Sequence, residues 1–108
     1  MKEKGYIVVF ITAGSEEEAV RIGKALVEER LTACANIVPR IRSIFHWEGK
    51  VCDEAEVLLI LKSKESLFQQ IKDRVIKLHS YDVPEIIALS IHSGSKDYLN
   101  WIDQVTKG

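Results

Sequence analysis

Two alternating segments on either side of a short polar turn constrain the fold more than any other feature of this sequence. Side chains of different character alternate from one position to the next along residues 33–47 and again along residues 51–62. Residues 48–50 separate the two segments. Alternation around such a turn predicts a β-hairpin. If extended, the fourteen steps of the first segment would span about 45 Å at roughly 3.3 Å each, whereas a compact chain of this size is only about 34 Å across. The hairpin must therefore bend or project from the rest of the molecule.

The predicted hairpin carries large apolar side chains, including Phe45 and Trp47, and Pro39 interrupts its first strand. A proline within a strand pattern favours an edge strand or a β-bulge. An exposed apolar hairpin is an aggregation hazard unless another subunit covers it. We therefore predict an oligomer with Pro39, Phe45 and Trp47 at the subunit interface.

Strand and helix patterns flank the hairpin on both sides. Residues 6–12 are β-branched or aromatic and apolar on both parities, which predicts a central strand covered on two faces. Ser15 and Glu18 form a capping box for a helix that ends near Arg30, and Ser63 is expected to cap a second helix. Residues 85–91 alternate as a strand. The segment Ser93-Gly94-Ser95 is expected to cap a last helix with Tyr98, Trp101, Ile102 and Val105 on one face.

This order of elements, β-α-β-β-α-β-α, predicts one domain over residues 1–108. The economical architecture is an α+β, ferredoxin-like βαββαβ sandwich with a long β-hairpin and an extra C-terminal helix.

The densest group of polar residues lies between the second helix and the last strand. His79, Tyr81, Asp82 and Glu85 fall within seven positions around Pro84, which fixes the backbone. Histidine is the one side chain that titrates near neutral pH without perturbation. These residues either help to build a polar site or close a helix and shape the turn after it. The residues alone leave both interpretations open.

Composition narrows the class of partners. The chain has 108 residues and a formal net charge of -1, with 15 Lys and Arg against 16 Asp and Glu. Because no basic run occurs, neither nucleic acid nor an anionic membrane is a predicted partner. The N-terminal residues lack signal-peptide features, and no apolar stretch approaches the roughly eighteen residues of a membrane helix. These observations predict a cytoplasmic protein.

The reactive side chains show no catalytic pattern. The sequence holds no recognisable nucleophile and base pair, phosphate loop or metal-hydrolase spacing, so we predict that the protein is not an enzyme. Cys34 and Cys52 lack close metal-type spacing and are predicted to be free thiols in a reducing compartment.

Five phrases follow one another along the chain: ERLTACANIVP at 29–39, WEGKV at 47–51, LILK at 59–62, LHSYDVPEI at 78–86 and YLNW at 98–101. Matching in order and spacing, they resemble the CutA family of divalent-cation tolerance proteins. The resemblance implies a tightly interlocked homotrimer of ferredoxin-like subunits, similar in architecture to the PII nitrogen-regulatory proteins. It also implies a cytoplasmic protein linked to tolerance of copper or other divalent cations.

Two departures from the family pattern concern the polar turn. The usual His-Pro-Tyr is here His79-Ser80-Tyr81, and serine does not lock the backbone as proline does. In some members copper binding is ascribed to a first-strand cysteine and two histidines before the tyrosine. At the matching positions this chain has Ile11, Leu78 and His79, so it retains only one of those ligands.

Two functional hypotheses follow, with different residues. In the first, a trimer binds copper or another divalent cation through His79 and Cys34, since imidazole and thiolate suit copper, and the site is shared between subunits or completed by water. A lone cysteine on a strand, such as Cys34, is nevertheless more often a small buried hydrophobe than a metal ligand. In the second, a PII-like regulatory trimer binds a small molecule or partner in intersubunit clefts. The cleft residues are then Glu56, Lys62, Tyr81, Glu85 and Trp101.

Overall fold

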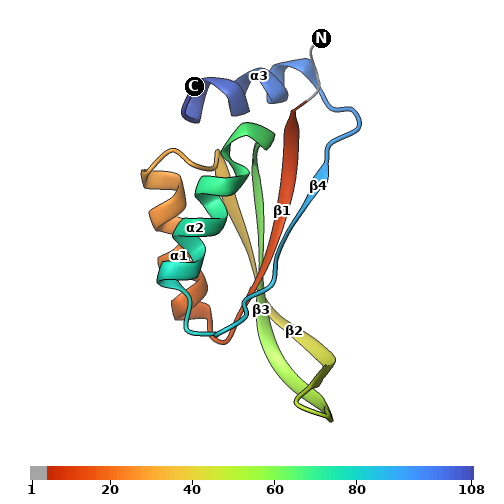
Figure 1. Cartoon of the computed structure of the whole chain (residues 1–108). Helices are drawn as coiled ribbons and strands as arrows, with labels where there is room; N and C mark the ends of the chain where they lie inside the picture. The colour runs from red at the N-terminus through yellow and green to blue at the C-terminus, as the bar shows by residue number, and fades with distance from the viewer. Residues whose placement is uncertain (1–4) are drawn as a thin grey trace.

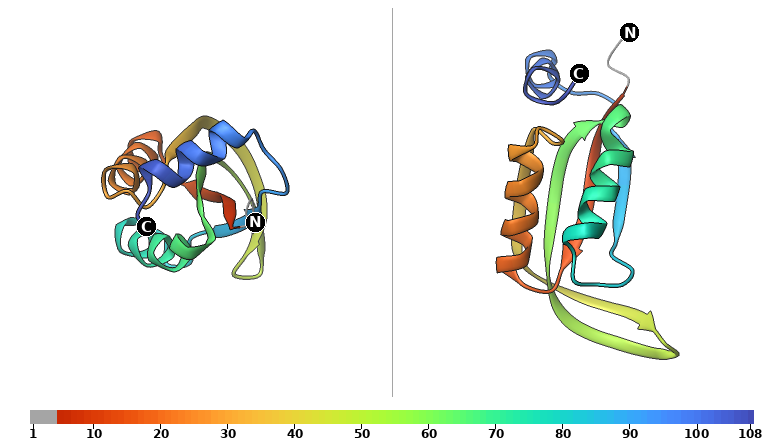
Figure 2. Two further views of the ribbon diagram at one scale, coloured as in Figure 1. Left: turned by 90° about the horizontal axis from the view of Figure 1, so that it is seen from above. Right: turned by 60° about the vertical axis from the view of Figure 1, so that its left-hand side comes forward.

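A four-stranded antiparallel sheet forms the centre of the computed structural model, which describes residues 5–108 (Figure 1). The strands are β1 (Tyr6–Ala13), β2 (Cys34–Trp47), β3 (Lys50–Lys64) and β4 (Ile86–Ser90), in the order β2-β3-β1-β4. Helices α1 (Glu16–Glu28) and α2 (Phe68–Leu78) cover one face of the sheet, and α3 (Lys96–Val105) lies across one end (Figure 2). This is the predicted α+β order of elements. Residues 1–4 of the predicted domain lie outside the described residues.

The main core lies between the sheet and helices α1 and α2. Helix α1 begins as predicted, because the Ser15 hydroxyl accepts a hydrogen bond of 3.1 Å from the Glu18 amide. Alternate side chains of the strands are buried against one stripe of each helix. The fully buried members are Val9, Ile11, Leu59 and Leu61 from the sheet, and Ala19, Ile22, Leu26, Ile71 and Val75 from the helices.

The opposite face of the sheet is apolar as well. In β1, β3 and β4, the side chains that alternate with the core residues are Val8, Phe10, Leu58, Ile60, Ile87 and Leu89. Ile87 is 50% exposed and Leu89 is 53% exposed. Helix α3 contacts this face only at one end, where Tyr6 packs against Leu99 and Ile102. Within residues 5–108 no helix covers the rest of the face (Figure 2), so a single chain leaves most of it open.

The β2–β3 hairpin projects beyond the helices, as its predicted length requires (Figure 1). The molecule is 45 Å long but only 25 and 22 Å across. A register shift between Val38 and Ile41 places a β-bulge at Pro39 and confirms the predicted irregularity. At the tip, Trp47 pairs with Lys50, and Glu48 and Gly49 both have positive φ, as a tight two-residue hairpin turn requires. Ile44, Trp47 and Val51 are exposed along the hairpin.

One predicted feature of the helices is wrong. Ser63 does not cap α2, because β3 continues through it and its buried hydroxyl donates a hydrogen bond of 2.6 Å to the Leu31 carbonyl. A short 3-10 turn (Glu65–Leu67) leads into α2 instead. In α3, the buried residues are Leu99 and Ile102, whereas Trp101 is 38% exposed. Ser95 occupies the N-cap position of α3 without a side-chain capping bond.

Candidate functional site

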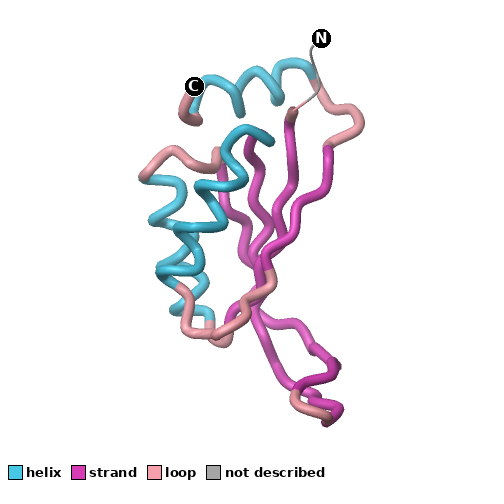
Figure 3. Tube along the Cα trace, viewed as in Figure 1, coloured by secondary structure: helices cyan, strands magenta, loops and turns pink. Residues whose placement is uncertain are grey.

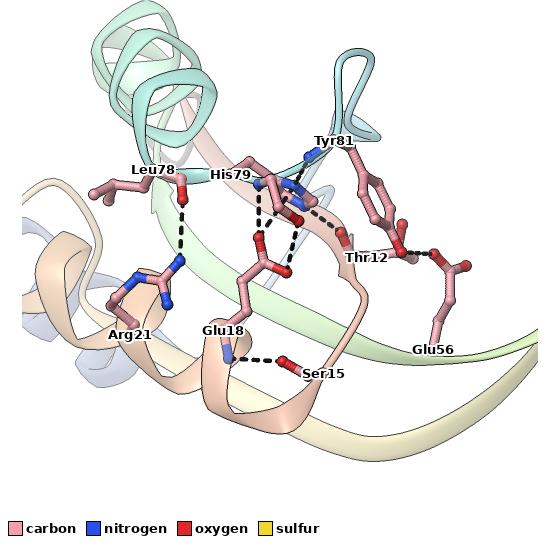
Figure 4. A network of polar contacts seen from close by, with 9 residues as sticks. Thr12, Ser15, Glu18, Arg21, Glu56, Leu78, His79 and Tyr81 are labelled. Atoms are coloured by element: carbon pink, nitrogen blue, oxygen red, sulfur yellow. Dashed lines mark hydrogen bonds and ion pairs between the residues drawn. The ribbon is translucent and has the colours of Figure 1, made fainter.

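The polar turn after α2 is attached to the rest of the molecule through His79, whose side chain is fully buried (Figure 4). His79 Nε2 lies 2.7 Å from the carbonyl oxygen of Thr12 in β1, and Nδ1 accepts a hydrogen bond of 3.1 Å from the Tyr81 amide. A carbonyl oxygen can only accept, so Nε2 carries the proton and Nδ1 presents its lone pair to Tyr81. Both ring nitrogens are therefore occupied in the neutral imidazole.

Glu18 holds the same turn from the first turn of α1. Its carboxylate accepts hydrogen bonds from the Ser80 amide at 2.7 Å and from the Ser80 hydroxyl at 3.1 Å, and it lies 3.5 Å from His79 Nδ1. Burial alone would raise the pKa of Glu18, but the hydrogen bonds from the Ser80 amide and hydroxyl hold its pKa below the usual value. The carboxylate therefore stays ionised in the folded protein at neutral pH.

Tyr81 extends this network to the sheet. Its hydroxyl donates a hydrogen bond of 2.8 Å to Glu56 Oε2 on β3, and its ring lies 4.6 Å from the imidazole of His79 between centroids (Figure 4). Burial, followed by the hydrogen bond and charge of Glu56, raises the pKa of Tyr81 well above its usual value. The hydroxyl therefore stays protonated and donates to Glu56, which is only 9% exposed.

A groove of about 730 Å³ lies between the hairpin and the loop from α2 to β4. This loop crosses the sheet near the base of the hairpin (Figure 3). The aromatic side chains of the groove lining are Phe45, Trp47 and Tyr81, and its carboxylates are Glu54, Glu56, Asp82 and Glu85. We call this feature the hairpin groove.

The hairpin groove is electronegative. Arg42 is the only basic residue of its lining, and Asp53, which lies outside the lining, binds that guanidinium through two hydrogen bonds of 2.9 and 2.7 Å. Burial and the charge of Glu56 raise the pKa of Glu85. Four carboxylates thus border the groove. The one guanidinium of its lining, that of Arg42, is already paired with Asp53.

The structure divides the five predicted cleft residues into two groups. Glu56, Tyr81 and Glu85 border the hairpin groove. Lys62 lies six residues beyond Glu56 along β3, about 20 Å away at roughly 3.3 Å per residue, and its ammonium donates to Asn36 Oδ1. Trp101 is on α3, where its ring lies 5.3 Å from that of Tyr98. One chain therefore does not bring all five residues into one cleft.

The two predicted metal ligands also lie apart. Cys34 pairs with Lys62 near α3, and its thiol is 3.8 Å from the Tyr98 hydroxyl, whereas His79 is bound to Thr12 further along the sheet. Cys34 and Cys52 are both free thiols, as predicted. Among residues 5–108, no three His, Cys, Asp or Glu side chains are arranged to hold a metal ion. The donor set of one described chain therefore does not fit a closed copper site.

Sequence patterns missed several residues of this region. Glu18 was assigned to a capping box, but its main partner, Ser80, lies 62 positions away, and no local pattern reports such a contact. Phe45 and Trp47 were predicted only as interface residues, yet they also border the hairpin groove. Alternation along β2 could not indicate this second role, because the groove lining takes residues of both parities, Arg42 and Ile44 as well as Ser43.

Comparisons with known proteins agree with the fold and with the phrases of the sequence. The family model described as CutA1 divalent ion tolerance protein matches residues 7–105. A divalent-cation tolerance protein CutA of Thermus thermophilus is 52% identical over 99 residues, which cover 92% of this chain and 96% of that relative. A chloroplastic CutA protein of Arabidopsis thaliana is 45% identical over 101 residues, which cover 94% of this chain and 56% of that relative.

The fold agrees at the level of coordinates. The solved structure of the divalent cation tolerance protein from Thermus thermophilus gives a TM-score of 0.92 at 50% identity, over 94% of this chain and 99% of that chain. The descriptions of the family model and of the Thermus relative refer to tolerance of divalent cations rather than to a catalysed reaction. No helix of the described residues is long and apolar enough to cross a membrane. The predicted cytoplasmic location stays a prediction, since the Arabidopsis relative is named as chloroplastic. The chain belongs to the family of CutA1 divalent ion tolerance proteins.

Proposed function

We propose that the protein acts in divalent-cation tolerance as a homotrimeric binding module whose clefts lie between neighbouring subunits. The observation that carries this proposal is the division of the predicted cleft residues into two groups. Glu56 and Lys62 share one parity of β3, yet Glu56 lies at the middle of the strand and Lys62 lies near its C-terminal end. A cleft that contains both groups takes Glu56, Tyr81 and Glu85 from one subunit, and Lys62 and Trp101 from another.

The uncovered sheet face supports assembly. Phe10, Ile60 and Ile87 are neighbours on this face in the register of β3, β1 and β4. Burial of apolar surface contributes roughly 25 cal/mol per Å², so a contiguous apolar face of this kind favours association. The outer strands β2 and β4 also have one unpaired edge each within a single chain. Phe45 and Trp47 border the hairpin groove, so a neighbouring subunit that covers the hairpin would close its open side.

The fluorescence of Trp101 tests the shared cleft. The chain has two tryptophans, so Trp47→Phe leaves Trp101 as the only one. In that background we expect Glu85→Gln to shift the emission of Trp101 and its quenching by iodide, because the carboxylate of a neighbouring subunit then lies near the indole. Glu16→Gln, an exposed carboxylate on α1, is the matched control and should change neither.

The trimer of each variant is verified by sedimentation before the spectra are compared. If Glu85→Gln leaves Trp101 unchanged in an intact trimer, the two groups of residues do not share a cleft.

A further inference from the structure

We propose that the hairpin groove binds a small organic cation with two or more ammonium groups, such as a linear polyamine. This inference rests on the proposed function, in which the groove is part of a ligand-binding cleft, and adds the chemical class of the ligand. The groove combines carboxylates on several elements with aromatic walls on the hairpin, and this combination suits an extended cation with apolar linkers.

The charge of the groove excludes other ligand classes. Glu54 and Glu56 lie on β3 and Glu85 precedes β4, so the carboxylates border the groove from one strand and from the loop after α2. Arg42 is already bound through two hydrogen bonds by Asp53. An anionic or neutral guest would leave the carboxylates without a counter-charge, whereas a cation supplies it.

Glu56 has accepting capacity left for such a guest. Tyr81 donates one hydrogen bond to Glu56 Oε2, whereas a carboxylate has about four lone-pair positions. Because the burial of Glu56 is deep and Tyr81 stays protonated, the orientation of this carboxylate is fixed before a ligand arrives. An ammonium group carries up to three donors and adapts to acceptors in varied directions.

The aromatic walls favour an organic cation over a bare metal ion. Phe45 is 37% exposed and Trp47 is 46% exposed, and both border the groove. Aromatic faces attract ammonium groups and pack against methylene linkers. The groove volume of about 730 Å³ falls within the range of small-molecule sites. A divalent metal instead needs convergent ligands at short distances, and residues 5–108 offer no group of three suitable side chains.

Isothermal titration of the full-length oligomer with spermidine tests the proposal at 150 mM NaCl. We expect saturable binding of spermidine and no binding of 1,4-butanediol, which has a similar linker without charge. Glu85→Gln and Glu54→Gln should each weaken spermidine binding roughly tenfold, since a hydrogen bond to a charged group is lost. Glu28→Gln, an exposed carboxylate on α1, is the matched control and should bind as the wild type does.

Three results would overturn the proposal: absence of spermidine binding at millimolar concentration, equal binding by the groove variants, or stoichiometric displacement of spermidine by equimolar Mg²⁺. Circular dichroism and sedimentation of each variant show that fold and assembly are retained. A response of Trp101 to Glu85→Gln together with a failure to bind spermidine would reject only the ligand class. The absence of that response rejects the shared cleft itself, whatever spermidine does.

Discussion

His79 holds the turn through both ring nitrogens, and this arrangement decides what its substitution does. His79→Ala removes the partner of the buried Thr12 carbonyl and leaves a cavity, so we expect a loss of about 2–4 kcal/mol in the free energy of unfolding. The number of copper ions bound per chain should stay unchanged, because neither ring nitrogen of His79 can bind copper without losing its hydrogen bond. Cys34→Ser should lower copper binding, since thiolate is the softer ligand and Cys34 is only partly buried.

Urea denaturation and copper titration under reducing conditions measure these two effects separately. A His79→Ala variant that keeps its stability but loses copper would show that His79 is a ligand. If neither substitution alters copper binding, metal coordination is elsewhere and the hypothesis of His79 and Cys34 as ligands is wrong.

Glu18 gives a prediction about pH. Its folded-state pKa lies below the ordinary value of 4.5, so its ionised form stabilises the folded protein above that value. This contribution is lost as the pH falls through the folded pKa. Glu18→Gln should therefore cost about 1–3 kcal/mol at pH 7, where a carboxylate bonded to Ser80 is lost, and progressively less below pH 4.

Chemical denaturation between pH 7 and pH 3 gives the difference between wild type and variant. Glu17→Gln is the matched control, because Glu17 is exposed in the same helical turn. A difference that is constant over this range would show that Glu18 acts through packing rather than through its charge.

At the scale of elements, the tip of the hairpin is expected to contribute to assembly of subunits more than to the folding of one chain. Trp47 is 46% exposed near its tip, so Trp47→Ala removes little buried surface within one chain. We expect faster subunit exchange with little change in far-ultraviolet circular dichroism, because aromatic anchors carry a large share of interface energy.

Ile76→Ala on α2, where Ile76 is 50% exposed, is the control and should not change the exchange rate. Mixing isotopically labelled and unlabelled protein, followed by native mass spectrometry, measures that rate. Equal exchange by wild type and Trp47→Ala would place Trp47 outside the interface.

The elements also show what could be predicted from the sequence. The hairpin and its bulge at Pro39 follow from period-two alternation and from the missing amide of proline, which are local properties. The role of Ser63 could not be predicted, because its partner, Leu31, lies 32 positions away. The hairpin groove was missed for a similar reason, since its lining comes from β1, the hairpin and the loop after α2. Local patterns indicated Tyr81 and Glu85 as candidate polar-site residues but not the side chains that face them.

At the scale of the whole molecule, folding and association should be linked. The apolar face opposite the helices would be buried against another copy of the chain only when subunits associate. The free energy of unfolding should therefore increase with protein concentration. Sedimentation equilibrium at low micromolar concentration should give a species three times the chain mass of 12.3 kDa. The thermal midpoint should rise with concentration over the range in which subunits associate. A well-folded species with the mass of one chain at these concentrations would contradict the trimer.

The link between Thr12 and His79 has a consequence for the order in which the chain folds. This hydrogen bond closes 67 positions of sequence, and the bond between Glu18 and Ser80 closes 62. Contacts of such separation form late, after the intervening elements are in place. The amide hydrogen of Ser80, which donates to Glu18, should then exchange with solvent only when much of the sheet opens. Although Ser80 lies in a loop, its hydrogen-exchange protection should match that of central strand β1, and the turn would report on global unfolding rather than on local motion.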